Sequence, residues 1–530
     1  MIASAAALAG PVALARPSQH LSATTRAARQ LWTAPSTRRG LRRGSGSTPA
    51  TPQRSSGVVR SMWLEKALAK VTGNQAGAKS SGPPSTMSFS DNAPSWEELS
   101  AMVAAKQAEL GVVEPDLENG PTNAKSMTRR FGKAEEPRVI LYRDHAAWCP
   151  YCQKVWLQLE EKQIPYTVQK INMRCYGDKP PEFLRMVPSG QVPVAKIDGK
   201  VVADSAAIQR QLEAMFPERP LLPPPGSSER ERADLLNRLE RTLFGAWMQW
   251  LTSNWGHDSG KASFCKVLDA VETQLSEGGG PYFMGDDISL VDMNFTPFLE
   301  RMDASLLYYK GLRVRDPKRW PAVCRWFEAM ESRPTYIGTR SDYYTHVHDL
   351  PPQLGGCAPH PDGAKAAAAI DGTDGESWHL PLAPLRTDSF EPYSPGESPA
   401  VDTTEAAAKM VANHAAIARF AARAVGKPGS KPVSAPLSDP TASPGLEHLE
   451  AVDAGLRHVV HALMVGPEAK QLSEHALQVD ADGKSGLSAL HVAASAGYLR
   501  DRVGVPRDMN LPAARQLRAH LNWLIDTLEA

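Results

Sequence analysis

The sequence lacks a long hydrophobic run and has few cysteines, and each shortage excludes a class of protein. No segment approaches the roughly 18 apolar residues that a membrane-spanning helix requires, so no membrane partner is expected. Six cysteines in 530 residues are too few for a disulfide-stabilised scaffold. A formal net charge of +1 gives no sign of a basic surface for nucleic acid. The sequence predicts a soluble protein that is long enough for a large core.

Acidic residues are missing from the start of the chain. Between Met1 and Leu64 there are nine arginines, no lysine, no aspartate and no glutamate. Together with abundant Ala, Ser, Thr and Pro, this composition is typical of an organellar transit peptide. The Ser, Thr and Pro content favours the chloroplast over the mitochondrion. A secretory signal is disfavoured, because the start has no basic segment and is interrupted by Pro11.

Two of the six cysteines, Cys149 and Cys152, are closely paired in the sequence WCPYC. Such a pair can be a metal clip, a structural disulfide or a redox thiol. A zinc site would need a second pair of ligands, and the histidine-rich segment 346–360 lacks helical ligand spacing. A structural disulfide is disfavoured in a reducing compartment. Redox or thiol-transfer chemistry is therefore the favoured interpretation.

An alternating pattern of short strands and helices surrounds the cysteine pair. The expected elements are a strand at 138–142, a helix at 150–163, a strand at 166–171, a short helix at 181–186, two strands joined by the turn Asp198–Gly199, and a helix at 205–215. A proline-rich hinge follows, and helical patterns then fill 229–344. The clearest of these helices begins at Ser289, with Asp292 completing a capping box.

With CPYC at the start of its first helix, the 138–217 segment resembles a thioredoxin-like domain of glutaredoxin type. Together with the helical segment after the hinge, it resembles the glutathione transferase superfamily, cysteine type. The motifs SGQVPV, ADSAAI and SLVD support this resemblance by their order and spacing. The fold implied is an α/β thioredoxin-like domain plus an all-α glutathione-transferase C-terminal domain, with an additional α-helical C-terminal extension.

The resemblance implies a glutathione site and suggests which residues form it. Val192, ahead of a cis Pro193, would pair its backbone with the cysteinyl part of glutathione. Asp204 would accept a hydrogen bond from the γ-glutamyl ammonium, while Ser205 and the helix N-terminus would hold the γ-glutamyl carboxylate. Lys179 stands thirteen residues before Val192, where cysteine-type members place a lysine against the glycyl carboxylate. Each residue also has a structural alternative: a turn, a helix cap or a surface charge.

The CPYC residues define the expected reaction. Cys149 is expected to precede the first helix, with Pro150 as its first residue, where free N–H groups and the helix dipole favour a thiolate. Cys152, one turn later and less exposed, is the expected resolving thiol. Pro150 and Tyr151 are expected to contact glutathione. The expected activity is thiol–disulfide exchange with glutathione mixed disulfides, with dehydroascorbate reduction as a further activity.

Three tryptophans at helical spacing follow the hinge, in the sequence FGAWMQWLTSNW. Trp247, Trp250 and Trp255 are expected on a helix that faces the cysteine cleft. Aromatic residues at this spacing most often belong to a core. The alternative is a second-substrate pocket beside glutathione, formed by Trp247 and Trp250.

The tail is helical and amphipathic, so its helices must bury a face. Helices are expected from Asp402 or Thr403 to Gly426, over 446–463 and from about Pro512. The tail resembles the extension of the iota-like class of photosynthetic organisms. It can cap the transferase body, bind a protein partner or build an oligomer such as a homodimer. One ankyrin-like half-repeat at 483–499 does not make an array.

These observations divide the chain into six expected segments. They are a transit peptide (1–64), a linker with an N-terminal helix (65–137), the thioredoxin-like domain (138–217), the all-helical domain (226–345), a second linker (346–400) and the helical extension (401–530). Besides a thiol transferase, two other functions stay open: a non-catalytic scaffold that binds glutathione or a partner, and a transferase that conjugates glutathione to electrophiles.

Overall fold

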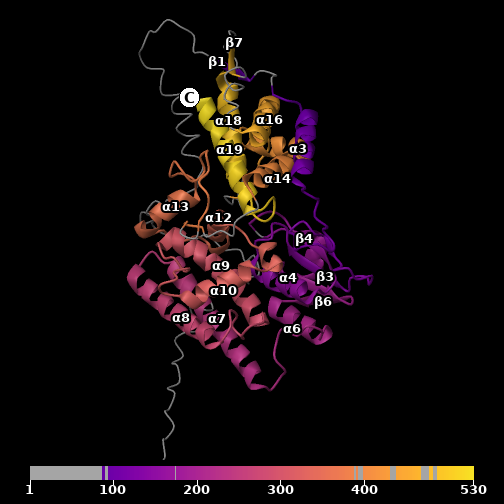
Figure 1. Ribbon diagram of the computed structural model, residues 1–530, viewed down its shortest axis with the longest axis vertical. Helices are drawn as coiled ribbons and strands as arrows, with labels where there is room; N and C mark the ends of the chain where they lie inside the picture. The colour runs from indigo at the N-terminus through magenta and orange to yellow at the C-terminus, as the bar shows by residue number, and fades with distance from the viewer. Residues whose placement is uncertain are drawn as a thin grey trace, which may run out of the picture.

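The computed structural model describes most of the chain after the first 85 residues. The described residues are 86–89, 93–173, 175–386, 389–391, 398–429, 437, 439–466, 477–480 and 486–529. The expected transit peptide at 1–64 lies outside them. Figure 1 shows a wider lower part, which holds the mixed sheet and the helices that follow it, and a narrower upper bundle of helices. None of the described helices is long and apolar enough to cross a membrane.

The sheet has five strands in the order β2-β4-β3-β5-β6. Its strands are β2 (Thr128–Arg129), β3 (Val139–Asp144), β4 (Tyr166–Ile171), β5 (Val194–Ile197) and β6 (Lys200–Ala203). Strands β3 and β4 are parallel, and the other three pairings are antiparallel. Helices α4 (Pro150–Lys162), α5 (Pro181–Met186) and α6 (Ser205–Met215) complete this unit. The element order expected from the sequence is confirmed.

Strand β2 was not expected, because it precedes residue 138 and is only two residues long. A buried ion pair holds it to α4: Arg129 Nε lies 2.9 Å from Glu160 Oε1, and both side chains are almost fully buried. The same carboxylate accepts hydrogen bonds from Thr122 Oγ1 at 2.7 Å and from the Tyr166 hydroxyl at 2.6 Å. A buried pair is stable when its remaining hydrogen-bonding capacity is filled in this way.

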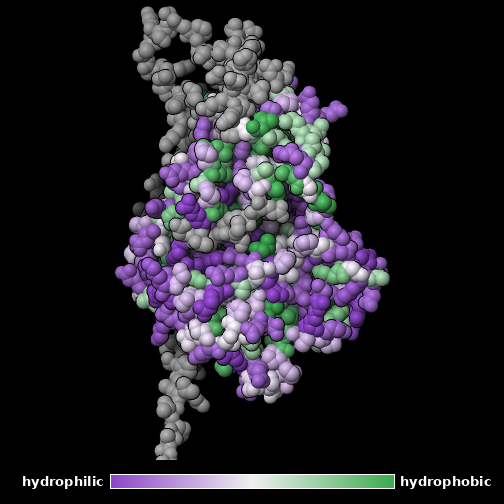
Figure 2. Space-filling model, in the orientation of Figure 1, coloured by the Kyte–Doolittle hydropathy of each residue, from purple (hydrophilic) through white to green (hydrophobic). Residues whose placement is uncertain are grey.

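The first five helices after the hinge form a helical unit, and the central one is buried almost throughout. They are α7 (Ser228–Leu251), α8 (His257–Glu277), α9 (Leu290–Lys310), α10 (Pro321–Glu331) and α11 (Pro334–Ile337). Helix α9 packs against α4 as well as α7, so it joins the helical domain to the sheet unit. On the face in Figure 2, hydrophilic residues cover most of the surface over these helices.

The capping box at the start of α9 is confirmed and extends further than expected. Asp292 Oδ2 accepts from the Ser289 N–H at 2.9 Å and from the Ser289 hydroxyl at 2.6 Å. Its Oδ1 accepts from the Phe283 N–H at 3.0 Å and from Trp326 Nε1 at 2.9 Å. A fully buried carboxylate therefore ties α9 to the preceding loop and to α10.

Replacing Asp292 with Ala is expected to lower the free energy of unfolding by about 3 kcal/mol, because buried donors lose their acceptor. Denaturation with guanidinium chloride, followed by tryptophan fluorescence, measures this change. The matched control is Asp287→Ala, an exposed position in the preceding loop, where a change within about 0.5 kcal/mol is expected. Equal effects of the two substitutions would contradict this account of the capping residue.

The segment 346–400, expected to be a linker, contains helices instead. Helix α12 (Tyr343–Leu354), the 3-10 turn η2 (Pro361–Gly363) and helix α13 (Ala364–Ile370) pack against α9. His346 explains part of this packing, because its Nε2 lies 2.5 Å from the buried Glu300 Oε1 of α9. The prolines that suggested a linker, Pro351 and Pro352, lie inside α12. Tertiary contacts here outweigh a composition that disfavours helix.

The upper bundle has a hydrophobic core of its own. Its elements are α3 (Trp96–Leu110), α14 (Pro399–Ala412), α15 (His414–Ala421), η3 (Ala422–Ala424), η4 (Leu446–His448), α16 (Leu449–Val465), α18 (Gly486–Arg500) and α19 (Leu511–Glu529). The backbone of β1 (Thr86–Phe89) pairs antiparallel with that of β7 (Leu477–Asp480). The helices of the extension thus bury their apolar faces against one another and against α3.

The N-terminal helix expected within 65–137 is confirmed as α3, which begins with a capping box between Ser95 and Glu98 and packs on the C-terminal helices (Figure 1). Two other expectations for this bundle need correction. Helix α14 is capped by Ser398, four residues before the expected Asp402. The single helix expected to reach Gly426 is broken at Asn413, where the backbone leaves the helical conformation.

Candidate functional site

The cysteine pair lies where β3 gives way to α4. Cys149 is the N-cap residue of α4, with an extended backbone, and Pro150 is the first helical residue. The Cys149 carbonyl accepts from the Gln153 N–H at 3.1 Å, which closes the first turn. Proline is favoured at this position, because its missing N–H would have no partner there. The expected local geometry is confirmed.

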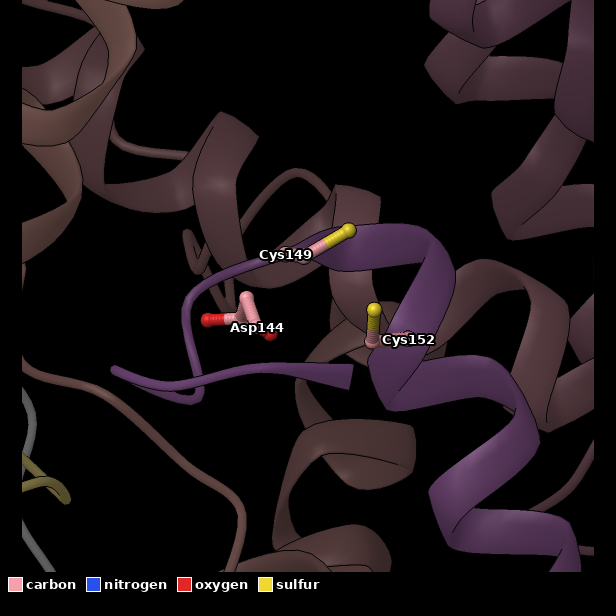
Figure 3. Close-up of side chains that lie close together, drawn as sticks. All are labelled: Asp144, Cys149 and Cys152. Atoms are coloured by element: carbon pink, nitrogen blue, oxygen red, sulfur yellow. The ribbon is translucent and has the colours of Figure 1, made fainter. Parts of the chain in front are cut away.

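Three side chains meet at this point, Asp144, Cys149 and Cys152. Their carboxylate oxygen and sulfur atoms all lie within 4.8 Å of one another. Figure 3 shows Cys149 at the start of the helix, with the Cys152 sulfur pointing toward it and Asp144 at the end of the strand below. None of the six cysteines, all within the described residues, forms a disulfide. Cys149 is 4% exposed and Cys152 1%, so the pair is more enclosed than expected.

Asp144 is the residue of this group that the sequence did not reveal. It is fully buried, and its Oδ2 accepts from the Trp148 N–H at 2.6 Å. Its Oδ1 is also buried and has no hydrogen-bond partner among the described residues. A buried acceptor without a donor is costly and invites a functional explanation. The only signal in the sequence is an acidic residue at the end of an apolar strand.

The pKa values of Cys152 and Lys179, two groups at the cysteine pair, are shifted in opposite directions. Burial, followed by the neighbouring Cys149 and Asp144, raises the pKa of Cys152 well above its usual range. Burial lowers the pKa of Lys179, while Cys149 and Cys152 act in the opposite direction as nearby negative charges. The Lys179 amine is thus close enough to interact electrostatically with the two cysteines.

The loop before Cys149 is fixed by contacts with α9. Arg301, buried in α9, donates from Nη2 to the Trp148 carbonyl at 2.5 Å and from Nη1 to Gln153 Oε1 at 3.2 Å. The Gln153 amide in turn donates to Glu300 Oε2 at 3.1 Å. The first turn of α4 is thus held by polar groups of the helical domain, which sequence analysis could not pair with it.

Val192, Pro193 and Asp204 lie at the positions expected from the sequence. The Val192–Pro193 peptide bond is cis. The Cys149 thiol lies 3.9 Å from the Val192 carbonyl oxygen, which places this backbone beside the cysteine. Asp204 has a positive φ of 78° and caps α6, its Oδ1 accepting from Ala206 N–H at 3.0 Å and Ala207 N–H at 3.1 Å. A non-glycine residue in this conformation is uncommon and is often found at functional sites.

The other expected glutathione residues lie in the first turn of α4, just before α5 or at the start of α6. Ser205 is buried and is the first residue of α6, so the cap of that helix is Asp204 and not Ser205. Lys179 Nζ donates to the Asn172 carbonyl. Tyr151 is half-buried and packs edge-on against Phe298 of α9, with ring centroids 5.6 Å apart. Glutathione binding by these residues stays a prediction.

Two of the three tryptophans belong to the core, as the favoured interpretation held, and the third does not lie on the expected helix. Trp247 and Trp250 are each 1% exposed and belong to the main hydrophobic core. The Trp247 indole N–H donates to Ser305 Oγ of α9 at 2.9 Å. Trp255 lies beyond the end of α7 and is 86% exposed. The core interpretation therefore holds for the two buried rings, and they do not offer an open surface to a second substrate.

A second group of three could be taken for a metal site, since atoms of His257, His360 and Asp362 lie within 4.8 Å of one another. The two imidazole rings are stacked, with centroids 3.5 Å apart and planes 12° apart. A ring nitrogen coordinates in the plane of its ring, so two stacked rings cannot share one ion in this arrangement. This geometry does not support a metal centre.

Comparison with known proteins places the two domains in one family. Residues 148–215 match the family model of the glutathione S-transferase N-terminal domain, and residues 256–329 match that of the C-terminal domain. The chain is 36% identical over 193 residues to glutathione S-transferase DHAR2 of Arabidopsis thaliana, which covers 36% of this chain and 84% of that protein. The chain belongs to the glutathione S-transferase family. Members of this family are enzymes that use glutathione as co-substrate.

A second relative and a solved structure are also similar to this transferase. Glutathione S-transferase DHAR3, chloroplastic, from Arabidopsis thaliana is 35% identical over 196 residues, with 37% of this chain and 69% of that protein covered. The crystal structure of Chlamydomonas reinhardtii dehydroascorbate reductase covers 42% of this chain and 96% of that chain, at 23% identity and a TM-score of 0.32. Among the relatives of this transferase are thus proteins described as chloroplastic and as cytosolic.

Proposed function

We propose that this transferase exchanges Cys149 with glutathione mixed disulfides and so removes glutathione from proteins or small thiols. The observation that carries the proposal is a cysteine at the N-cap of α4 with a second thiol and a carboxylate within 4.8 Å. A hydroxyl residue in place of Cys149 would suit activation of glutathione's own thiol, whereas a cysteine can bond to it. Dehydroascorbate is a second candidate oxidised substrate for the same thiol.

In the first step the Cys149 thiolate attacks the glutathionyl sulfur of the mixed disulfide. The substrate sulfur leaves as a thiolate and takes up a proton, and Cys149 becomes disulfide-bonded to glutathione. The N-terminal N–H groups of α4 and the nearby Lys179 favour the anionic sulfur. This step needs no residue beyond the first turn of α4 and the charge beside it.

In the second step the Cys149–glutathione disulfide is broken by another thiol. Either a second glutathione attacks and releases oxidised glutathione, or Cys152 attacks the Cys149 sulfur and expels the glutathione thiolate. In the second route Cys152 must first lose a proton, and burial raises the pKa of Cys152. We assign Asp144 as the acceptor of that proton, because a carboxylate oxygen of Asp144 lies within 4.8 Å of the thiol and its Oδ1 has no hydrogen-bond partner among the described residues.

We expect glutathione to be held by the residues that the sequence suggested. The backbone at Val192 can pair with the cysteinyl part, since its carbonyl already faces Cys149. Asp204 and Ser205, at the start of α6, suit the γ-glutamyl group, and Lys179 suits the glycyl carboxylate. In the same proposal, the arginine-rich first 64 residues direct the enzyme to the chloroplast.

Intact mass spectrometry of the reduced protein, exposed to oxidised glutathione, tests this function. The Cys152→Ser variant is expected to gain one glutathionyl group, and the Cys149→Ser variant to gain none at the pair. Adduct formation at Cys149 would be incompatible with a purely conjugating transferase. If neither form gains the adduct, a scaffold that binds glutathione or a partner becomes the better interpretation.

A further inference from the structure

The loop between α18 and α19, residues 501–510, lies against the residue that precedes the nucleophile. The indole N–H of Trp148 donates to the Val505 carbonyl at 3.1 Å, across 357 positions of sequence. The Ser341 hydroxyl donates to the same carbonyl. The Arg507 guanidinium lies 5.0 Å from the centre of the Trp148 ring. The C-terminal extension therefore reaches the catalytic loop directly.

This loop is held in one shape by its own hydrogen bonds. Asp508 Oδ2 accepts from the Gly504 N–H at 2.8 Å and from Arg507 Nη2 at 2.6 Å. Arg507 Nη2 also donates to the Arg502 carbonyl at 2.7 Å. A loop fixed in this way presents the Val505 carbonyl and Gly504 to Trp148 as a rigid surface.

The same loop is locked to the transferase body by a buried ion pair. Arg518 of α19 lies 2.7 Å from Asp342, the N-cap of α12, and both side chains are at most 2% exposed. Arg518 also donates to the Val503 carbonyl at 2.8 Å, and the Tyr344 hydroxyl donates to the Asp501 carbonyl at 3.0 Å. Loss of one partner of such a pair leaves a buried charge, so separation of the extension from the body is strongly disfavoured.

We propose that the loop 501–510 is part of the active site of this transferase and positions Trp148, and through it Cys149, for reaction. The inference deepens the proposed thiol exchange and rests on it for the kinetic readout. Trp148 has no freedom of its own, because its N–H, carbonyl and indole N–H are all engaged. A shift of its ring must therefore move the backbone that carries the Cys149 sulfur or break one of these three bonds.

The packing at Gly504 offers a sharp test of this coupling. A Cβ at position 504 would lie 2.6 Å from Trp148 Cζ2, the edge of a rigid and fully buried ring. Gly504→Ala must therefore displace the ring or the loop backbone that faces it. Gly497, in α18 of the same extension, is a matched control, since a Cβ there would meet only Ile525 Cδ1 at 3.8 Å, an ordinary contact.

The readout is the rate at which iodoacetamide alkylates Cys149, located by peptide mass spectrometry, together with kcat and KM for glutathione exchange. Gly504→Ala is expected to change the alkylation rate and kcat by about tenfold with little change in KM, and Gly497→Ala by less than about twofold. Trp148→Phe removes the Cζ2 edge, so the double variant with Gly504→Ala should match Trp148→Phe alone. A purely structural role of Gly504 would instead give effects that multiply.

A second variant keeps the test decisive if Gly504→Ala fails to fold. Arg507→Met removes the charge above the Trp148 ring, whereas Arg457→Met removes an ion pair with Asp453 inside the upper bundle. Only Arg507→Met is expected to change the rate of Cys149 alkylation. The inference would be overturned if Cys149 were alkylated at the same rate in Gly504→Ala as in Gly497→Ala, and at the same rate in Arg507→Met as in Arg457→Met. Altered alkylation in a protein that shows no glutathione exchange would support the loop's role while refuting the proposed function.

Discussion

Replacing Cys149 with Ser is expected to abolish glutathione exchange, with kcat/KM for a glutathionylated peptide falling by about three orders of magnitude or more. A serine hydroxyl is not ionised near neutral pH and cannot form the mixed disulfide through which the reaction passes. The N-cap position of residue 149 tolerates serine well, so the fold should be kept. Activity is measured by the release of the free peptide thiol under initial-rate conditions.

Cys324→Ser is the matched control for the loss at Cys149. Cys324 lies on α10 in the helical domain, and burial raises its pKa to about 11, so it is a poor nucleophile near neutral pH. Its substitution should leave the exchange rate within about twofold of the unmodified protein. Retention of full exchange by Cys149→Ser, or an equal loss in both variants, would show that the reaction does not use the predicted nucleophile.

The placement of the pair at the N-terminus of α4 was predictable because its signals are local. An apolar strand, a cysteine followed by proline and a helical pattern together define the strand end and the helix N-terminus. The Asp198–Gly199 turn likewise defines the hairpin of β5 and β6 within a few residues. Each of these features depends on neighbours in sequence, so one sequence suffices to place them.

The features that were missed depend on contacts between distant segments. Strand β2 is held in place by the buried ion pair between Arg129 and Glu160. Helix α12 forms in a proline-rich stretch because its His346 pairs with Glu300 of α9. Helix α3 was predicted correctly by its capping box, yet its partners lie more than 300 positions later. Asp144 carries no motif at all. Its place beside the two thiols appears only when β3 and α4 bring its carboxylate to them.

The second large effect is expected from Asp144→Asn. The asparagine can still accept from the Trp148 N–H, so the loop before Cys149 should keep its geometry. It cannot take a proton from Cys152, and general-base catalysis of such a transfer is worth about 10²-fold or more. Formation of the Cys149–Cys152 disulfide from the glutathionylated enzyme should therefore slow by about 10²-fold. Rapid acid quenching followed by intact mass measures this single step.

The pH dependence separates a proton acceptor from a structural residue. Because burial raises the pKa of Cys152, a thiol without an acceptor ionises only at high pH, and the Asp144→Asn rate should climb steadily as the pH increases. With Asp144 present, the Cys149–Cys152 disulfide should form rapidly near neutral pH, and the rate of this step should change little at higher pH. In the Cys152→Ser background, Asp144→Asn should not further change the monothiol exchange rate, since no second thiol awaits deprotonation. A parallel drop in that background would assign Asp144 to the scaffold of the loop and leave the proton from Cys152 to solvent.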